Sequence, residues 1–183
     1  GPGVWCPYGR GGQEMYTLAP DMEADGKPSD SLGAPFGIQE MGSEITADGH
    51  RLFKVNGRPV LIRGGGWSSD MLLRRDPARL ETELRYVRDM GLNTVRLEGK
   101  LESEEFYDLA DRYGILVIAG WCCCDHWEKW EDWDGEDHWV AVESLRHQIL
   151  RLRNRASLLA WFNGSDFAPP PPVERAYLGV LRE

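Results

Sequence analysis

Short apolar segments and longer amphipathic segments alternate from about residue 51 onward, and this alternation constrains the fold more than any other feature. The apolar segments have the length of strands, and the expected parallel strands are 59–63, 94–98, 115–119 and 157–162. A segment with helical periodicity follows each of them, the last near 173–183. Strands that alternate with helices form parallel sheets with right-handed crossovers. The pattern predicts four βα units, which fit either a small open sheet or half of a barrel.

Capping residues bracket the first two expected helices. Asp76 is a suitable N-cap for the first, and Gly91 can end that helix in a left-handed conformation. Ser103 and Gly114 occupy the corresponding positions around the second helix. A long loop is expected over about 120–138, before a third helix begins.

The first 50 residues have a different texture, because Gly, Pro, Asp and Ser interrupt short segments that lack a helical period. Such material is typical of strands and loops. The turn Asn56-Gly57, between apolar segments at 51–55 and 59–63, predicts a β-hairpin. No charged stretch followed by an apolar run stands near the N-terminus, so no signal peptide is expected in this sequence.

Charge and length exclude several classes of protein. Lys and Arg number 21 against 30 Asp and Glu, so the formal net charge is −9, and such an acidic chain is a poor binder of nucleic acid. No segment is long and apolar enough to span a membrane. The 183 residues are too few for a complete (β/α)8 barrel, which takes about 200 or more. Because the sequence ends inside an expected helix, we expect it to be truncated.

Carboxylates follow three of the four expected strands. Asp70 comes after the first strand, Glu98 after the second and Asp166 after the fourth, while Trp67 and Trp121 follow the first and the third. The active residues of parallel α/β folds collect at the carboxyl ends of the strands. We therefore expect these side chains to surround one site.

The glycine run 64–66 has two interpretations. A phosphate-binding loop needs glycines that lead directly into a helix, usually with a Lys. Here Trp67 follows, and the next helix is expected only after Asp76. Close approach of the backbone at a barrel rim is therefore favoured over nucleotide binding.

An acidic segment at 125–137 carries seven Asp and Glu against one Lys, with tryptophans at three-residue intervals. It fits a solvated loop whose Trp rings pack on a rim, or a wall of a sugar site, because aromatic faces stack on pyranose rings and carboxylates attract a cationic ligand. Calcium binding is a third alternative, although the spacing of a calcium loop is missing. The cysteines at 122–124 precede Asp125, and buried free thiols are favoured over a metal site there.

Three stretches resemble glycoside hydrolase family 2. Residues 53–64 are similar to the start of its catalytic barrel, 90–96 to its second strand, and 106–117 to its second helix and third strand. The resemblance implies an α/β fold in which 46–183 form the N-terminal half of a (β/α)8 TIM barrel.

The N-terminal part resembles the same family. Residues 5–9 and 36–38 are similar to the last strands of the immunoglobulin-like β-sandwich that precedes the barrel in that family. The resemblance therefore implies that 1–45 are the C-terminal strands of an immunoglobulin-like domain.

Two departures from most family members resemble its exo-β-D-glucosaminidase branch. Ser165-Asp166 stands where most members have Asn-Glu after strand four, and Glu98 stands where many have a Ser-His pair after strand two. The resemblance implies that Asp166 is the general acid/base and that Glu98 binds the ammonium group of glucosamine. It assigns the nucleophile to a Glu at the end of strand seven, outside this sequence.

The same resemblance implies a retaining hydrolase that removes terminal glucosamine from chitosan oligosaccharides, without a cofactor or a metal. Further residues at the expected rim are candidates for substrate binding: Ser165, Trp67, Asp70, Trp121 and Asp125. An extracellular location is expected, because chitosan polymers lie outside cells. Two alternatives stay open: a β-mannoside as substrate, and a non-catalytic truncated fragment.

Overall fold

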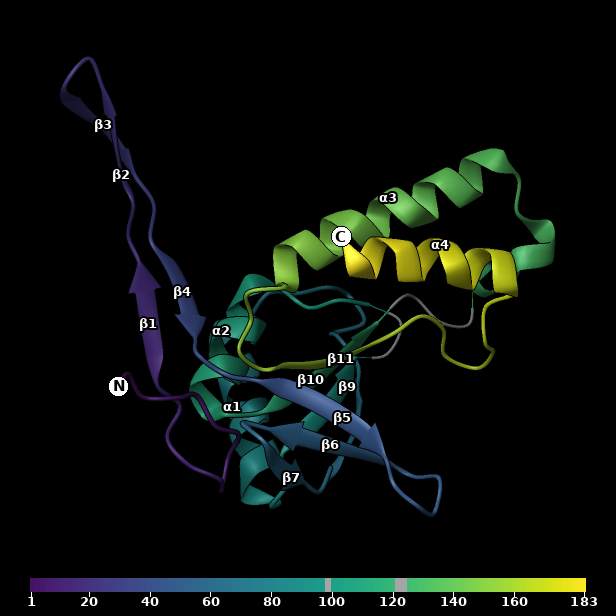
Figure 1. Cartoon of the computed structure of the whole chain (residues 1–183), viewed down its shortest axis with the longest axis horizontal. Coiled ribbons are helices and arrows are strands. Elements are labelled where there is room, and N and C mark those ends of the chain that lie inside the picture. The colour runs from purple at the N-terminus through teal and green to yellow at the C-terminus, as the bar shows by residue number, and fades with distance from the viewer. Residues whose placement is uncertain (98–99, 121–124) are drawn as a thin grey trace.

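A parallel sheet forms the centre of the structure. The computed structural model describes residues 1–97, 100–120 and 125–183 (Figure 1). The strands of the sheet follow the order β11-β10-β9-β8, and every pairing in it is parallel. Their bounds are β8 (Gly64–Trp67), β9 (Thr94–Leu97), β10 (Leu116–Gly120) and β11 (Leu158–Phe162). Each strand lies beside its predecessor in the sequence, which confirms the predicted succession of βα units.

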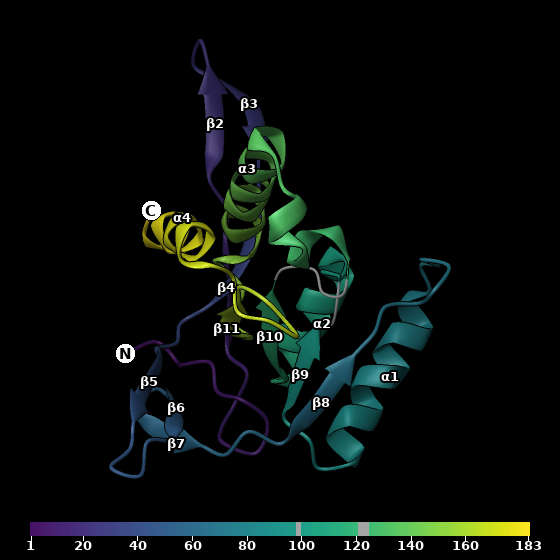
Figure 2. The same cartoon turned by 90° about the vertical axis from the view of Figure 1, so that its right-hand side faces the viewer.

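A helix follows each of these strands. The helices are α1 (Pro77–Asp89), α2 (Glu104–Tyr113), α3 (Gly135–Leu152) and α4 (Pro171–Arg182). α1 packs beside α2, and α3 packs beside α4 (Figure 2). The predicted caps are confirmed: Asp76 accepts a hydrogen bond from the N–H of Arg79, and Gly91 and Gly114 adopt left-handed φ angles of 73° and 70°. Ser103 is the N-cap of α2 but makes no side-chain capping bond.

The N-terminal part is antiparallel. β1 (Met15–Leu18) pairs with β4 (Ala34–Gly37), β2 (Asp21–Ala24) pairs with β3 (Lys27–Ser31), and β6 (Arg51–Val55) lies between β5 (Met41–Ile45) and β7 (Arg58–Val60). The β2–β3 ribbon projects away from the remaining elements (Figure 1). These pairings agree with the expected strand-rich N-terminus. The assignment of 1–45 to an immunoglobulin-like sandwich, and the boundary near residue 45, stay predictions.

The hairpin at Asn56-Gly57 is confirmed, but its second strand is shorter than predicted. Asn56 and Gly57 have φ angles of 51° and 71°, as a tight hairpin turn requires. β7 ends at Val60, and the first parallel strand is β8 rather than 59–63. The buried Asn93 explains the break, because its side chain accepts from the N–H of Arg63 and donates to the carbonyl of Leu61. These bonds take backbone groups that a continuous strand would have used.

The glycine run therefore lies inside a strand and not in a loop after it. A Cβ atom on Gly64 would come within 2.1 Å of the carbonyl oxygen of Thr94, whereas one on Gly65 would meet nothing within 4 Å. Close approach of the backbone was the predicted reason for the glycines. It occurs at Gly64, across the β8–β9 pairing.

The expected loop over 120–138 is partly helical. Two short 3₁₀ helices, η1 (His126–Glu128) and η2 (Trp130–Asp132), precede α3. Asp134 accepts from the N–H of Asp137, and the Asp137 carboxylate accepts from the N–H of Asp134. This reciprocal capping box starts α3 at Gly135, earlier than the apolar periodicity indicated.

Among the residues that the structure describes, three apolar clusters hold the elements together. The first fills the space between the sheet and α1 and α2, with Leu84 and Phe106 fully buried. The second joins α3 and α4 to the 3₁₀ segment. A third links Trp5 and the β6–β7 hairpin to Leu116, at the amino end of β10. The third cluster therefore packs the N-terminal elements against the amino end of the parallel sheet.

Candidate active site

The loop after β11 carries the predicted acid. Asp166 is exposed there, and Ser165 is half-buried beside it. The guanidinium of Arg96, on β9, donates a hydrogen bond of 2.7 Å to the hydroxyl of Ser165. The Arg96 guanidinium carbon also lies 5.5 Å from the centre of the Phe162 ring. The structure therefore ties the end of β11 to β9, two strands away in the sheet.

Glu128 is a second residue that holds this loop. One of its carboxylate oxygens accepts from the backbone N–H of Ser165 and, at 3.1 Å, from the N–H of Asp166. The side chain belongs to η1 and only 7% of the residue is exposed. Sequence reasoning missed Glu128 among the site residues, because it is one acid among seven in its segment and its partners lie 37 and 38 positions away.

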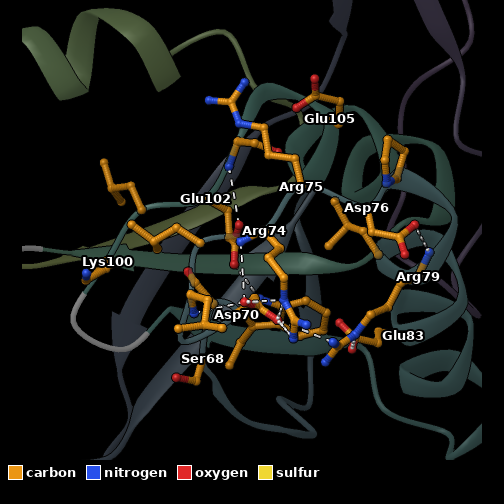
Figure 3. A pocket seen from close by; sticks show the side chains of 18 of the residues that line it. Ser68, Asp70, Arg74, Arg75, Asp76, Arg79, Glu83, Lys100, Glu102 and Glu105 are labelled. Atoms are coloured by element: carbon orange, nitrogen blue, oxygen red, sulfur yellow. Dashed lines mark hydrogen bonds and ion pairs between the residues drawn. The ribbon is translucent and has the colours of Figure 1, made fainter.

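A hollow of about 1100 Å³ opens between the β8–α1 loop and the β9–α2 loop (Figure 3). Trp67 and Asp70 line it, and neither Ser165 nor Asp166 does. Trp67 donates its indole N–H to Glu102 at 2.9 Å and packs against Phe106 with ring centres 5.2 Å apart. The hollow and the predicted acid are therefore separate features, although both lie at the carboxyl ends of the strands.

Asp70 organises its own loop. Its carboxylate accepts from the N–H of Leu72 and pairs with the guanidinium groups of Arg74 at 2.7 Å and Arg79 at 3.3 Å (Figure 3). The bonds from Arg74, followed by that from Leu72, hold the pKa of Asp70 well below its ordinary value. Asp70 is therefore ionised at neutral pH and unsuited to donate a proton. Its predicted contact with substrate, like that of Trp67, stays a prediction.

Several side chains of the acidic segment make contacts within the segment itself. Asp125 caps η1 by accepting from the N–H of Trp127, and Asp137 pairs with His126 at 2.9 Å. The half-buried rings of the segment pack against the α3–α4 cluster: Trp127, Trp130 and Trp133. This packing agrees with the interpretation of a loop whose rings are packed, and the alternative, a wall of a sugar site, stays a prediction. The predicted role of Asp125 in substrate binding stays a prediction.

Several predicted residues lie outside the described parts of the chain: Glu98, Trp121 and the cysteines at 122–124. Within 1–97, 100–120 and 125–183, no group of three or more His, Cys, Asp and Glu is placed to hold a metal ion. None of the helices described has both the length and the apolar character that crossing a membrane requires.

Comparison with known proteins connects this geometry to a family. A family model described as "Glycosyl hydrolases family 2, TIM barrel domain" matches residues 47–168. The exo-β-D-glucosaminidase of Streptomyces avermitilis is 44% identical over 188 residues, which cover 99% of this chain and 21% of that protein. The mannosylglycoprotein endo-β-mannosidase of Lilium longiflorum is 36% identical over 200 residues, covering 99% of this chain and 20% of that protein.

A solved structure agrees with both sequence matches. The crystal structure of Amycolatopsis orientalis exo-chitosanase superposes with a TM-score of 0.93 at 39% identity, covering 99% of this chain and 22% of the other. The chain thus spans about a fifth of the length of these relatives. The parallel βα units, the family match and the shared fold lead to one assignment: the chain belongs to glycosyl hydrolases family 2, with residues 47–168 in its TIM barrel domain.

Proposed function

We propose that this chain contributes the general acid/base, Asp166, to an exo-β-D-glucosaminidase that removes terminal β-linked glucosamine from chitosan oligosaccharides. The observation that carries the proposal is the 44% identity, over nearly the whole chain, to a protein named for that activity. The close fold match to an exo-chitosanase supports it. Asp166 supports it as well, because the residue is exposed in the loop that follows β11, on the side of the sheet where the active residues of such folds collect.

The proposed chemistry needs two carboxylates. A retaining glycosidase places them about 5–5.5 Å apart on either side of the scissile bond. Asp166 donates a proton to the glycosidic oxygen as that bond breaks, while the second carboxylate attacks the anomeric carbon. Asp166 then takes a proton from the water that releases the sugar. By the family resemblance, the second carboxylate is a Glu at the end of strand seven, in a part of the enzyme beyond this chain.

Selectivity for glucosamine is assigned to Glu98. The sugar carries an ammonium group, and a carboxylate recognises it through a charge-assisted hydrogen bond. The chain's formal net charge of −9 favours the approach of a cationic polymer. Because chitosan is too large to enter cells intact, we propose that the enzyme acts outside them.

A β-mannoside is the second candidate substrate, and one observation favours it. The lily relative, named as an endo-β-mannosidase, is 36% identical over 99% of this chain. A purified enzyme containing this chain should be offered matched p-nitrophenyl β-glucosaminide, β-glucoside and β-mannoside. The proposal predicts the highest kcat/KM for the glucosaminide, whereas preference for the mannoside would establish the alternative.

Glu98→Gln sharpens this experiment. It removes the charge and keeps the size of the side chain, so turnover of the glucosaminide should fall far more than turnover of the glucoside. Equal losses on both would argue against recognition of the amine. The 183-residue chain alone should show no glycosidase activity, because it lacks the proposed nucleophile; robust turnover by a purified monomer of it would contradict this assignment.

A further inference from the structure

The backbone at Ser165 and Asp166 is held by a side chain from a distant part of the sequence. A single oxygen of the Glu128 carboxylate accepts from both N–H groups, and the bond from Asp166 measures 3.1 Å. On the other side of the same loop, Arg96 donates to the Ser165 hydroxyl at 2.7 Å. The loop is thus fixed both through its backbone and through a side chain.

Burial of the Glu128 carboxylate has a desolvation cost that its hydrogen bonds must offset. A carboxylate that leaves water loses its hydration, and hydrogen bonds to the charged oxygens must replace it. Glu128 is 7% exposed, whereas its neighbours Lys129 and Glu131 are exposed. The two N–H donors belong to the residues with the proposed chemistry and not to the helical segment that carries Glu128.

The segment that presents Glu128 is itself anchored. Asp125 caps η1 through the N–H of Trp127, and the Trp127 ring packs in the α3–α4 cluster. Trp133 closes the segment by donating its indole N–H to the carbonyl of His126 at 2.9 Å. Glu128 therefore projects from a fixed support toward the loop after β11.

We propose that Glu128 is a positioning residue for the general acid. By accepting from two successive N–H groups, its carboxylate fixes the Ser165–Asp166 peptide and so sets where the Asp166 carboxyl group stands relative to the glycosidic oxygen. The inference rests on the proposed function of Asp166. It also explains the place of Glu128 in an acidic segment whose other carboxylates cap helices or face solvent.

Two conservative variants separate position from charge. Glu128→Gln loses the charge but keeps an oxygen at the same reach, so it can still accept from both N–H groups. Glu128→Asp keeps the charge but withdraws the oxygens by the length of one methylene group. Since a misplacement of about 1 Å can reduce the rate about 100-fold, positioning predicts that Asp lowers kcat tenfold or more, with KM changed less than threefold, and that Gln stays within about threefold of wild type.

The experiment is done in the intact enzyme, with Glu131→Asp as the matched control because Glu131 is exposed in the adjacent η2. Circular dichroism and urea midpoints establish that each variant is folded. A folded Glu128→Asp with wild-type kcat would overturn the inference. So would a Gln variant that loses as much as Asp, because that result would indicate a role for the charge itself.

Asp166→Ala, measured in parallel, keeps this test distinct from that of the proposed function. If Asp166→Ala retains activity, the assignment of the acid fails whatever Glu128 does. If Asp166→Ala is inactive and Glu128→Asp is normal, only the positioning role fails. As a readout independent of turnover, the amide proton resonances of Ser165 and Asp166 should move upfield in Glu128→Asp and keep their positions in Glu131→Asp.

Discussion

Gly64→Ala is the substitution whose effect the structure specifies most closely. The added Cβ would lie 2.1 Å from the carbonyl oxygen of Thr94, and Cβ atoms in real structures essentially never come closer than 3.0 Å to another heavy atom. The shortfall is 3.0 − 2.1, or 0.9 Å, and backbone must move to provide it. Gly65→Ala is the matched control in the same strand, because its Cβ would meet nothing within 4 Å.

The expected energies of the two variants have opposite signs. Forcing β8 away from β9 adds about 1–3 kcal/mol of overpacking. It also stretches backbone hydrogen bonds that contribute about 0.5–1.5 kcal/mol each. A loss of about 3 kcal/mol is therefore expected for Gly64→Ala. For Gly65→Ala we expect a gain of about 0.5 kcal/mol, because alanine reduces the entropy of the unfolded chain.

Urea denaturation followed by tryptophan fluorescence measures both variants. With an m-value of about 2 kcal/mol/M, the Gly64→Ala midpoint should fall by about 1.5 M, and the Gly65→Ala midpoint should rise by about 0.25 M. Equal midpoints for the two variants would refute the close approach of β8 to Thr94.

Other substitutions test the supports of the site. Asp111→Ala should lower the free energy of unfolding by about 1–3 kcal/mol, because the buried N–H of Ser157 loses its acceptor. Asp111→Asn retains that acceptor and is the control; an equal loss in Asp111→Asn would contradict the prediction. Asp134→Ala should cost about 1 kcal/mol through the N-cap of α3, measured by thermal unfolding. The hydrogen bond with His126, followed by the one from the N–H of Asp134, lowers the pKa of Asp137. The ionised Asp137 carboxylate therefore stabilises the fold at pH values above the ordinary Asp pKa near 4, and this stabilisation is lost as the pH falls below that value. Wild type should therefore exceed Asp137→Asn in stability at pH 6, and this difference should shrink as the pH falls below about 4; a difference that stays the same or grows in acid would contradict the lowered pKa.

Local signals predicted much of the fold correctly. These signals depend only on residues close together in the sequence. They are the alternation of strands and helices, the Asn56-Gly57 turn and the caps at Asp76 and Gly91, and each appears in the structure as expected. The position of the first parallel strand was predicted wrongly, because local signals alone do not indicate a strand made of glycines. Glycine lacks strand propensity, and only the opposing Thr94 carbonyl shows why a residue without a Cβ is needed there.

The candidate site was predictable only in part. Strand ends and the family resemblance brought attention to Ser165 and Asp166, which lie together at the carboxyl end of β11. The contacts that hold them come from Arg96 and Glu128, which are 69 and 37 residues from Ser165. Spacing along one sequence cannot identify pairs at such a distance. The tryptophans of the acidic segment illustrate the same limit, because their three-residue spacing did not indicate that they pack against α3 and α4.

The most direct test of the account is the response of Asp166→Ala to the leaving group of the substrate. A general acid assists a poor leaving group such as a sugar hydroxyl, and it contributes little when the leaving group is an acidic phenol; its usual contribution is about 10²–10⁴-fold. We expect Asp166→Ala, in the intact enzyme, to lose at least about 100-fold in kcat/KM on chitosan oligosaccharides and far less on dinitrophenyl β-glucosaminide. Near-normal turnover of the oligosaccharides, or equal losses on both substrates, would contradict the assignment of Asp166 as the acid.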